Sequence, residues 1–251
     1  MHFFLKTTKT KFPFKLCKKG CDTDFAIHHT LEWREKYKPW LMTPSALKEN
    51  EKGWIYYRGF SPNPFVDDDK EAGHGMIWYR PGLKKIGDAE AYSRTIINAF
   101  DTAIADSLIR SNNRVGKVNI LLDCKGFGIS YIPRLSDMVK LITMMQDHYP
   151  DKFGMLIIAH LQGAAGIVLK MAMPLLPEAV RYKIRILPND EKKSRDLLKI
   201  MVVEEFIPDW LGGVDNYRFD ANSYYDPDGS GRRYFSEEEG REYLVTMPYH
   251  A

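Results

Sequence analysis

The amino-acid sequence predicts an α/β fold, in which a parallel-dominated mixed sheet is flanked by helices and preceded by a short helical leader. Two observations carry this prediction. From residue 88 onward, short apolar segments typical of buried strands alternate with segments of helical periodicity, which indicates βαβ units. Two strand-like segments rich in aromatic residues, 55–58 and 76–79, precede that region. The chain has 251 residues, enough for one such domain with a sizeable core.

The elements before the alternating region are short. Residues 25–37 predict a helix that ends before Pro39, because proline cannot continue it. Residues 61–75 hold two prolines and three consecutive aspartates, so they predict an exposed loop between the two aromatic strands.

The alternating region begins at Asp88, whose side chain can cap the helix that follows. The core face of this helix is expected to carry Tyr92, Ile96, Ala99, Phe100 and Ala103, which recur at helical spacing. The later strands and helices are expected, in chain order, at residues 117–123, 133–148, 154–159, 164–173, 183–187 and 190–201. In the helix over 133–148, the residues expected to face the core are Leu135, Met138, Val139, Ile142 and Met145.

Charge is unevenly distributed along the chain. The formal net charge is +3, but residues 1–21 hold six lysines and no acid, so the remainder carries −3. Phenylalanines interleave with these lysines, as suits a segment that binds an anionic membrane surface, where each lysine contributes about 1 kcal/mol. A solvated basic end of the leader explains the same pattern. The segment lacks the apolar centre of a secretory signal.

Cysteine content favours a reducing compartment. The chain has three cysteines, an odd number that does not form a disulfide framework. We therefore expect a cytoplasmic protein.

One apolar stretch, residues 155–176, is long enough to span a bilayer. Residues that break or charge a membrane helix interrupt it, namely His160, Gln162, Gly163, Gly166, Lys170 and Pro174. Because these breakers fall where a turn would sit, the stretch predicts a buried strand followed by a buried helix.

Catalytic residues were sought at the carboxyl ends of the predicted parallel strands. Asp123, Cys124 and His160 could supply an orienting acid, a nucleophile and a base there. A capping aspartate, a buried thiol and a core histidine explain the same residues. Ser130 replaces the arginine of the phosphatase pattern, and Tyr131 replaces the third glycine of a dinucleotide fingerprint. The sequence contains no P-loop, and we expect a protein that is not an enzyme.

Two patterns have the spacing of metal ligands. Cys17 and Cys21 followed by His28 and His29 are loosely zinc-like. A second pattern matches a calcium loop position for position, through Asp226, Asp228, Ser230 and Glu237. Positive charge from two arginines inside that loop favours a simple turn over a calcium site, and no metal is expected.

Six segments, in the same order along the chain, resemble the CRAL-TRIO family of lipid-binding domains. They lie within about residues 25–215 and are 31–37 (LEWREKY), 78–82 (WYRPG), 122–126 (LDCKG), 149–152 (YPDK), 173–177 (MPLLP) and 207–213 (IPDWLGG). The resemblance implies an apolar cavity that encloses a lipid. It divides the chain into a basic helical leader (1–45), a lipid-binding domain (46–215) and a C-terminal extension (216–251).

The resemblance also implies which residues enclose the lipid. The segment from residue 167 to 176 is apolar nearly all round, with Lys170 its only charge, so it must be buried or must cover something apolar. Plain core packing explains this as well. In the family the segment is a gate over the acyl chains, and we expect the cavity between the sheet and residues 166–180. The expected pocket and gate residues are Ile157, Ala159, Ile167, Val168, Met171, Met173, Leu175 and Leu176.

A headgroup site is implied in the same way. Inositol-lipid-binding members pair a lysine and an acid at positions that match Lys183 and Asp151. The expected headgroup residues are Lys183, Asp151, Lys152 and Arg181. Three positions where family members hold the headgroup with hydroxyls are apolar in this chain, namely Val118, Ile120 and Val180. Phosphatidylcholine is therefore disfavoured, and phosphatidylinositol is supported in part.

Three functions follow as hypotheses. The first is transfer or presentation of a lipid, phosphatidylinositol by preference, with no cofactor beyond the bound lipid. The second is carriage of another hydrophobic ligand, such as a sterol, a tocopherol or a retinoid. The third is a hydrolase that uses Cys124 and His160. The expected partner is a transient membrane surface and not a nucleic acid, and a monomer is favoured.

Overall fold

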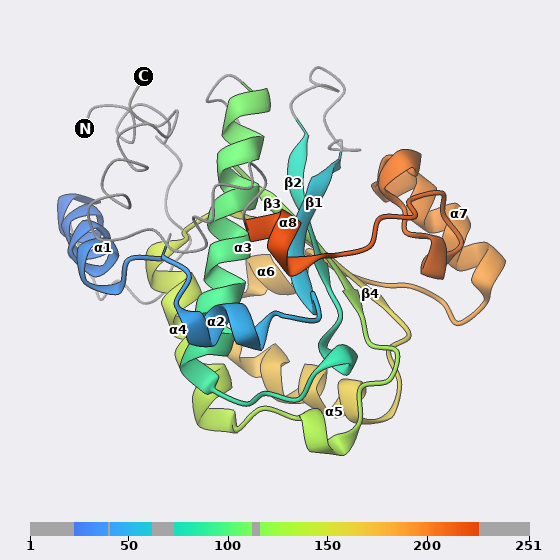
Figure 1. Ribbon diagram of the computed structural model, residues 1–251, viewed down its shortest axis with the longest axis horizontal. Helices are drawn as coiled ribbons and strands as arrows, with labels where there is room; N and C mark the ends of the chain where they lie inside the picture. The colour runs from blue at the N-terminus through green and yellow to red at the C-terminus, as the bar shows by residue number, and fades with distance from the viewer. Residues whose placement is uncertain (1–22, 40, 62–72, 112–115, 226–251) are drawn as a thin grey trace.

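The structure is a computed structural model that describes residues 23–39, 41–61, 73–111 and 116–225 (Figure 1). The basic segment 1–21, with Cys17 and Cys21, lies outside these residues. So do the four calcium-loop candidates, Asp226, Asp228, Ser230 and Glu237.

The described residues build one mixed sheet, as the sequence predicts. Its strands lie side by side in chain order, β1-β2-β3-β4-β5. The first pair is antiparallel, and every later pair is parallel. The strands are β1 (Ile55–Ser61), β2 (His74–Tyr79), β3 (Val118–Asp123), β4 (Phe153–Ala159) and β5 (Ile184–Ile186).

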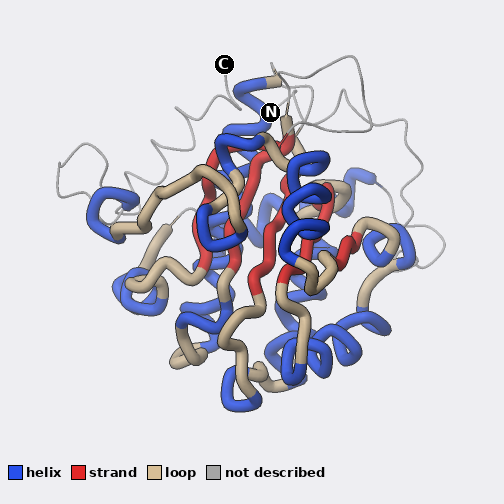
Figure 2. Tube along the Cα trace, turned by 90° about the vertical axis from the view of Figure 1, so that its right-hand side faces the viewer, coloured by secondary structure: helices blue, strands red, loops and turns tan. Residues whose placement is uncertain are grey.

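One face of the sheet, which we call the crossover face, carries the helices that connect the parallel strands (Figure 2). Ile77 and Val118 of the sheet pack there against Ile97 and Phe100, which lie in the first of these helices. Asp88 caps that helix by accepting hydrogen bonds from the backbone N–H groups of Glu90 and Ala91, as predicted. The connecting helices are α3 (Ala89–Arg110), α4 (Leu135–His148) and α5 (Gly163–Ala172).

The opposite face, which we call the α7 face, is covered by segments late in the chain. Leu198 and Met201 of α7 (Glu191–Met201) pack there against Trp78 and Ile157. Further residues between 206 and 224 extend this cluster over the same face, so the beginning of the expected C-terminal extension belongs to the core. The remaining elements are η2 (Pro81–Leu83), η3 (Ile129–Tyr131), η4 (Met173–Leu175), α6 (Glu178–Arg181), η5 (Glu204–Phe206), η6 (Asp209–Leu211) and α8 (Ala221–Tyr225).

The apolar stretch over 155–176 forms most of β4 and then α5, as predicted. Among the described helices, none is both long enough and apolar enough to cross a membrane.

The inward face of α4 agrees with the prediction in part. Met138 is buried and Met145 packs into the core of the crossover face, as predicted. Leu135 and Val139 are exposed, whereas Leu141 and Met144 pack into that core. The helix carries two adjoining apolar stripes, and periodicity alone does not decide which of them meets the sheet. The outer stripe continues to Gln146, whose Nε2 donates a hydrogen bond to the carbonyl oxygen of Leu175 in η4 at 3.0 Å.

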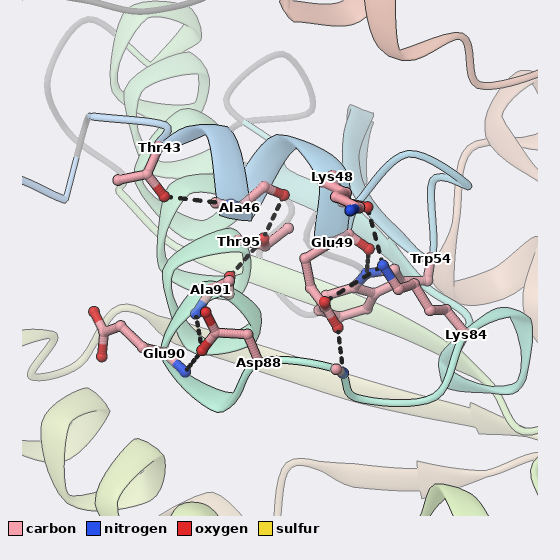
Figure 3. A network of polar contacts seen from close by, with 11 residues as sticks. Thr43, Ala46, Lys48, Glu49, Trp54, Lys84, Asp88, Glu90, Ala91 and Thr95 are labelled. Atoms are coloured by element: carbon pink, nitrogen blue, oxygen red, sulfur yellow. Dashed lines mark hydrogen bonds and ion pairs between the residues drawn. The ribbon is translucent and has the colours of Figure 1, made fainter.

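A short helix that the sequence does not predict, α2 (Pro44–Glu49), is held by a network of polar contacts (Figure 3). Thr43 accepts a hydrogen bond from the backbone N–H of Ala46, which caps the helix. At its other end, Trp54 Nε1 donates to the carbonyl oxygen of Glu49 at 2.8 Å, and Lys84 Nζ lies 3.3 Å from Glu49 Oε2. Tertiary contacts therefore stabilise a helix of six residues that would be marginal alone.

The predicted leader helix, α1 (Thr23–Tyr37), packs against α4 through an aromatic contact. The ring of Trp33 stacks on His148 with 4.2 Å between centroids. Burial, together with the nearby positive charges of His29 and Arg34, lowers the pKa of His148 to about 4. His148 is therefore neutral in the folded protein at neutral pH.

Acidification should weaken this contact. The pKa of His148 is depressed in the folded state, so the unfolded chain takes up a proton between its ordinary pKa of 6.5 and the folded value of about 4. Stability is then full above pH 6.5 and falls as the pH drops through that window. Because His148 is about half-buried, we expect a loss of about 1–2 kcal/mol. Urea unfolding of wild type and His148→Phe, at pH about 7.5 and about 4.5, measures it. An equal loss in both proteins would contradict the prediction.

Candidate functional site

The expected headgroup residues lie at the edge of the sheet where the parallel strands begin. Lys117 precedes β3, Asp151 and Lys152 precede β4, and Lys183 precedes β5. Asp151 Oδ1 lies 3.4 Å from Lys117 Nζ and 4.0 Å from Lys183 Nζ. Lys183 Nζ also donates a hydrogen bond to the carbonyl oxygen of Phe153 at 2.8 Å. The matched pair Lys183 and Asp151 is therefore close in space.

We call this group the lysine cluster (Lys117, Lys152 and Lys183 around Asp151). Burial changes the pKa values of its lysines. Desolvation lowers the pKa of Lys152 and of Lys183, although Asp151 opposes the change. Such lysines gain free energy from an additional anion, because their charge is poorly solvated. Arg181, by contrast, is exposed at the end of α6 and makes no ion pair with Asp151 among the described residues.

Lys117 was missed by the sequence analysis. The signal that could have found it is topological, because residues that precede neighbouring parallel strands meet at one edge of a sheet. Behind the cluster, His74 Nδ1 lies 3.1 Å from Asn119 Oδ1. Burial lowers the pKa of His74, so this buried group adds no positive charge at neutral pH.

The expected pocket and gate residues are not brought into one wall. Ile157 and Ala159 lie in the core of the α7 face. The α5 helix lies on the crossover face, where Ala165 and Leu169 pack with Ile158. The outer side of the gate segment stays accessible, since Ile167 is 49% exposed. The other expected gate residues are half-buried, namely Val168, Met171, Met173, Leu175 and Leu176.

The expected cavity between the sheet and residues 166–180 stays a prediction. In the described residues, side chains of β3, β4 and the beginning of α5 meet directly and pack as core, and Leu169 is the member of residues 166–180 that belongs to this cluster. The small residues Ala164 and Ala165 allow this close approach of helix and sheet.

Two hollows lie instead at the edge where the parallel strands end. The first, which we call the Arg80 pocket, has a volume of about 320 Å³, and Lys52, Tyr56, Arg80, Trp210, Arg218 and Phe219 are among its lining residues. The second, which we call the His160 pocket, has a volume of about 500 Å³, and Cys124, Lys125, Phe127, His160 and Gln162 are among its lining residues.

The His160 pocket contains the residues of the hydrolase hypothesis. His160 Nδ1 and Asp123 Oδ1 are 2.7 Å apart, and Asp123 is buried. Burial and the charge of Asp123 raise the pKa of Cys124 to about 12, so the thiol is not a nucleophile at neutral pH. In the described part of the chain, Cys124 makes no hydrogen bond to His160. The geometry therefore does not support a cysteine hydrolase.

Comparison with known proteins gives the family. The model of the CRAL/TRIO domain matches residues 65–213, which is more than half of the chain. The chain belongs to the CRAL/TRIO domain family. The resemblance that the sequence analysis drew from six short segments is thereby confirmed, and the match lies inside the predicted lipid-binding domain.

Two curated relatives align with most of this chain. The CRAL-TRIO domain-containing protein T23G5.2 of Caenorhabditis elegans is 20% identical over 198 residues, which are 74% of this chain and 27% of that protein. Protein real-time of Drosophila pseudoobscura pseudoobscura is 22% identical over 196 residues, 73% of this chain and 28% of that protein. The chain thus spans little more than a quarter of these relatives.

A solved structure supports the fold. The crystal structure of Sfh5 aligns with a TM-score of 0.56 at 16% identity, over 88% of this chain and 76% of that chain. The CRAL/TRIO domain is a lipid-binding and lipid-transfer domain, so this chain carries a domain for a hydrophobic ligand.

Proposed function

We propose that this CRAL/TRIO domain binds phosphatidylinositol and transfers or presents it at membranes. The observation that carries the proposal is the lysine cluster, in which three lysines surround the single carboxylate of Asp151. The formal charges of these four side chains sum to +2. Charge-assisted hydrogen bonds to a phosphate are about twice as strong as neutral ones, so a phosphoinositol headgroup suits this place.

The gate segment supports contact with a membrane. Ile167 of α5 is exposed, and Lys170 is exposed one turn further along the same helix. On α4, the exposed side chains of Leu135 and Val139 are followed by exposed Lys140. Apolar side chains beside lysines suit an anionic lipid surface. In this proposal, α5 moves away from the sheet at the membrane, together with η4 that follows it in the chain, and a cavity for the lipid opens between α5 and the sheet.

Replacing Lys183 tests the headgroup assignment. Lys183→Ala should reduce transfer of phosphatidylinositol between liposomes by about tenfold, because a half-buried charged donor to the headgroup is lost. Transfer of an uncharged hydrophobe, such as a sterol, should change little. The matched control is Lys192→Ala, which removes an exposed lysine of α7 that belongs neither to the cluster nor to the surface of α4 and α5 described above.

The outcomes separate the hypotheses. Equal loss for both ligands would point to damaged folding, which an unfolding curve of the variant detects. Unchanged phosphatidylinositol transfer would overturn the headgroup assignment and leave the family intact. In that case a ligand without a phosphate gains support, because Val180 is apolar where family members place a hydroxyl.

A further inference from the structure

The Arg80 pocket is separate from the lysine cluster. Arg80 follows the last residue of β2, whereas Lys117 precedes the first residue of β3, and these strands are parallel. The two sites therefore lie at opposite ends of the sheet, about 20 Å apart for strands of this length. Six of the nine residues that line the pocket also lie outside the range that the family model matches.

Positive charge dominates the pocket lining. Lys52, Arg80 and Arg218 line it together with one carboxylate, that of Asp209. Arg218 Nη2 lies 2.6 Å from Asp209 Oδ2, so this pair compensates itself. Lys52 is exposed and makes no ion pair among the described residues. The pocket therefore offers a net positive charge to a ligand.

Arg80 is held in place from two sides. Its Nε lies 3.8 Å from Asp123 Oδ2, and its Cζ lies 4.2 Å from the centre of the Trp210 ring. Asp123 is shared with His160, so its carboxylate does not neutralise Arg80 alone. A guanidinium fixed in this way presents its remaining N–H groups in a constant direction, which suits a phosphate or a carboxylate.

The aromatic wall of the pocket carries an unused donor. Trp210 Nε1 is buried and has no hydrogen-bond partner in the described part of the chain. Buried indole N–H groups in folded proteins usually have a partner. The rings of Tyr56 and Phe219 line the same hollow, with 5.2 Å between their centroids. A flat apolar group fits against this wall while an anion meets the cations.

We propose that the Arg80 pocket binds a small molecule in which an anionic phosphate or carboxylate group is attached to a flat ring. Its volume of about 320 Å³ suits a ligand of one ring with one such group. The anion contacts Arg80 and Lys52, and the ring packs on Tyr56 and Trp210. This site is independent of the lipid-binding function proposed above.

Phenyl phosphate is the probe for a test by NMR on the full chain. The five tryptophans give separate indole N–H resonances, and Trp210→Phe identifies that of Trp210. Titration with phenyl phosphate should move the Trp210 resonance in a saturable way. Phenol and inorganic phosphate, each alone, should bind at least about tenfold more weakly, because each lacks half of the contacts.

Substitutions of the lining cations test whether their positive charges bind the phosphate group of phenyl phosphate. Lys52→Gln should weaken phenyl phosphate binding by about tenfold, whereas Lys140→Gln, an exposed lysine on α4, should leave it unchanged. Arg80→Gln should abolish binding of phenyl phosphate. If Arg80→Gln unfolds because its contact with Asp123 is lost, Lys52→Gln still tests the proposal. The proposal is overturned if the Trp210 resonance does not move, if Lys52→Gln and Lys140→Gln bind alike, or if inorganic phosphate binds as tightly as phenyl phosphate.

Discussion

Gly75→Ala should destabilise the protein by about 3 kcal/mol, because the added methyl group has no space. A Cβ at Gly75, in β2, would lie 2.2 Å from the carbonyl oxygen of Ala103 in α3. That oxygen belongs to the helix backbone and cannot move away as a side chain would. Relief of the clash requires α3 to shift from β2, and both elements are in the core of the crossover face.

Gly166→Ala is the matched control for this prediction. It makes the same chemical change inside α5, where a Cβ would meet nothing within 4 Å. Because alanine favours the helix, this variant should be more stable by about 0.5–1 kcal/mol. Urea unfolding of both variants gives the comparison. A Gly75→Ala protein as stable as wild type would show that β2 and α3 are further apart than described.

The second large effect is expected at a buried ion pair. Arg58→Met should cost about 2–3 kcal/mol of unfolding free energy, because it leaves the buried carboxylate of Asp215 without its partner. The guanidinium of Arg58 donates to both oxygens of Asp215, at 2.9 and 3.1 Å. It also lies over the ring of Tyr217, with 4.4 Å between Cζ and the ring centre, so methionine loses this contact as well.

The chain offers a matched exposed pair. Arg218 and Asp209 form the same type of two-contact interaction, at 2.6 and 3.4 Å, on the surface. Arg218→Met should change stability little, because solvent screens exposed pairs. Measured unfolding free energies of the two variants therefore separate the effect of burial from that of geometry. Equal effects at both positions would contradict this prediction.

Local signals predicted most of the fold. Asp88 caps α3 as expected, since a capping aspartate acts within its own helix turn. β3 and β4 were found because burial on both faces makes them mostly apolar, with Asn119 and Asp123 the polar residues of β3. By contrast, α2 was missed, because its stability comes from contacts outside the helix, with nearby Trp54 and with Lys84 and Thr95, which are distant in sequence.

The candidate site was predictable to a smaller extent. The resemblance identified Lys183 and Asp151, which the structure places close together. Lys117 and the Arg80 pocket depend on which strand ends are neighbours and on residues from both ends of the domain. No local pattern carries that information. The inner face of α4 was predicted correctly at Met138 and Met145 but not at Leu135 and Val139, since neighbouring helices decide which of its apolar residues are covered.

The sequential strand order affects how this protein folds during synthesis and which face of the sheet can be exposed afterwards. Each parallel strand joins its predecessor through a helix on the crossover face, so that layer is complete as soon as β5 has been synthesised. The α7 face is covered only later, by residues that follow the whole sheet in the chain. A nascent chain therefore holds a finished sheet with one bare apolar side. In the mature protein, that side can be uncovered by a hinge after β5, without undoing any of the connections between strands.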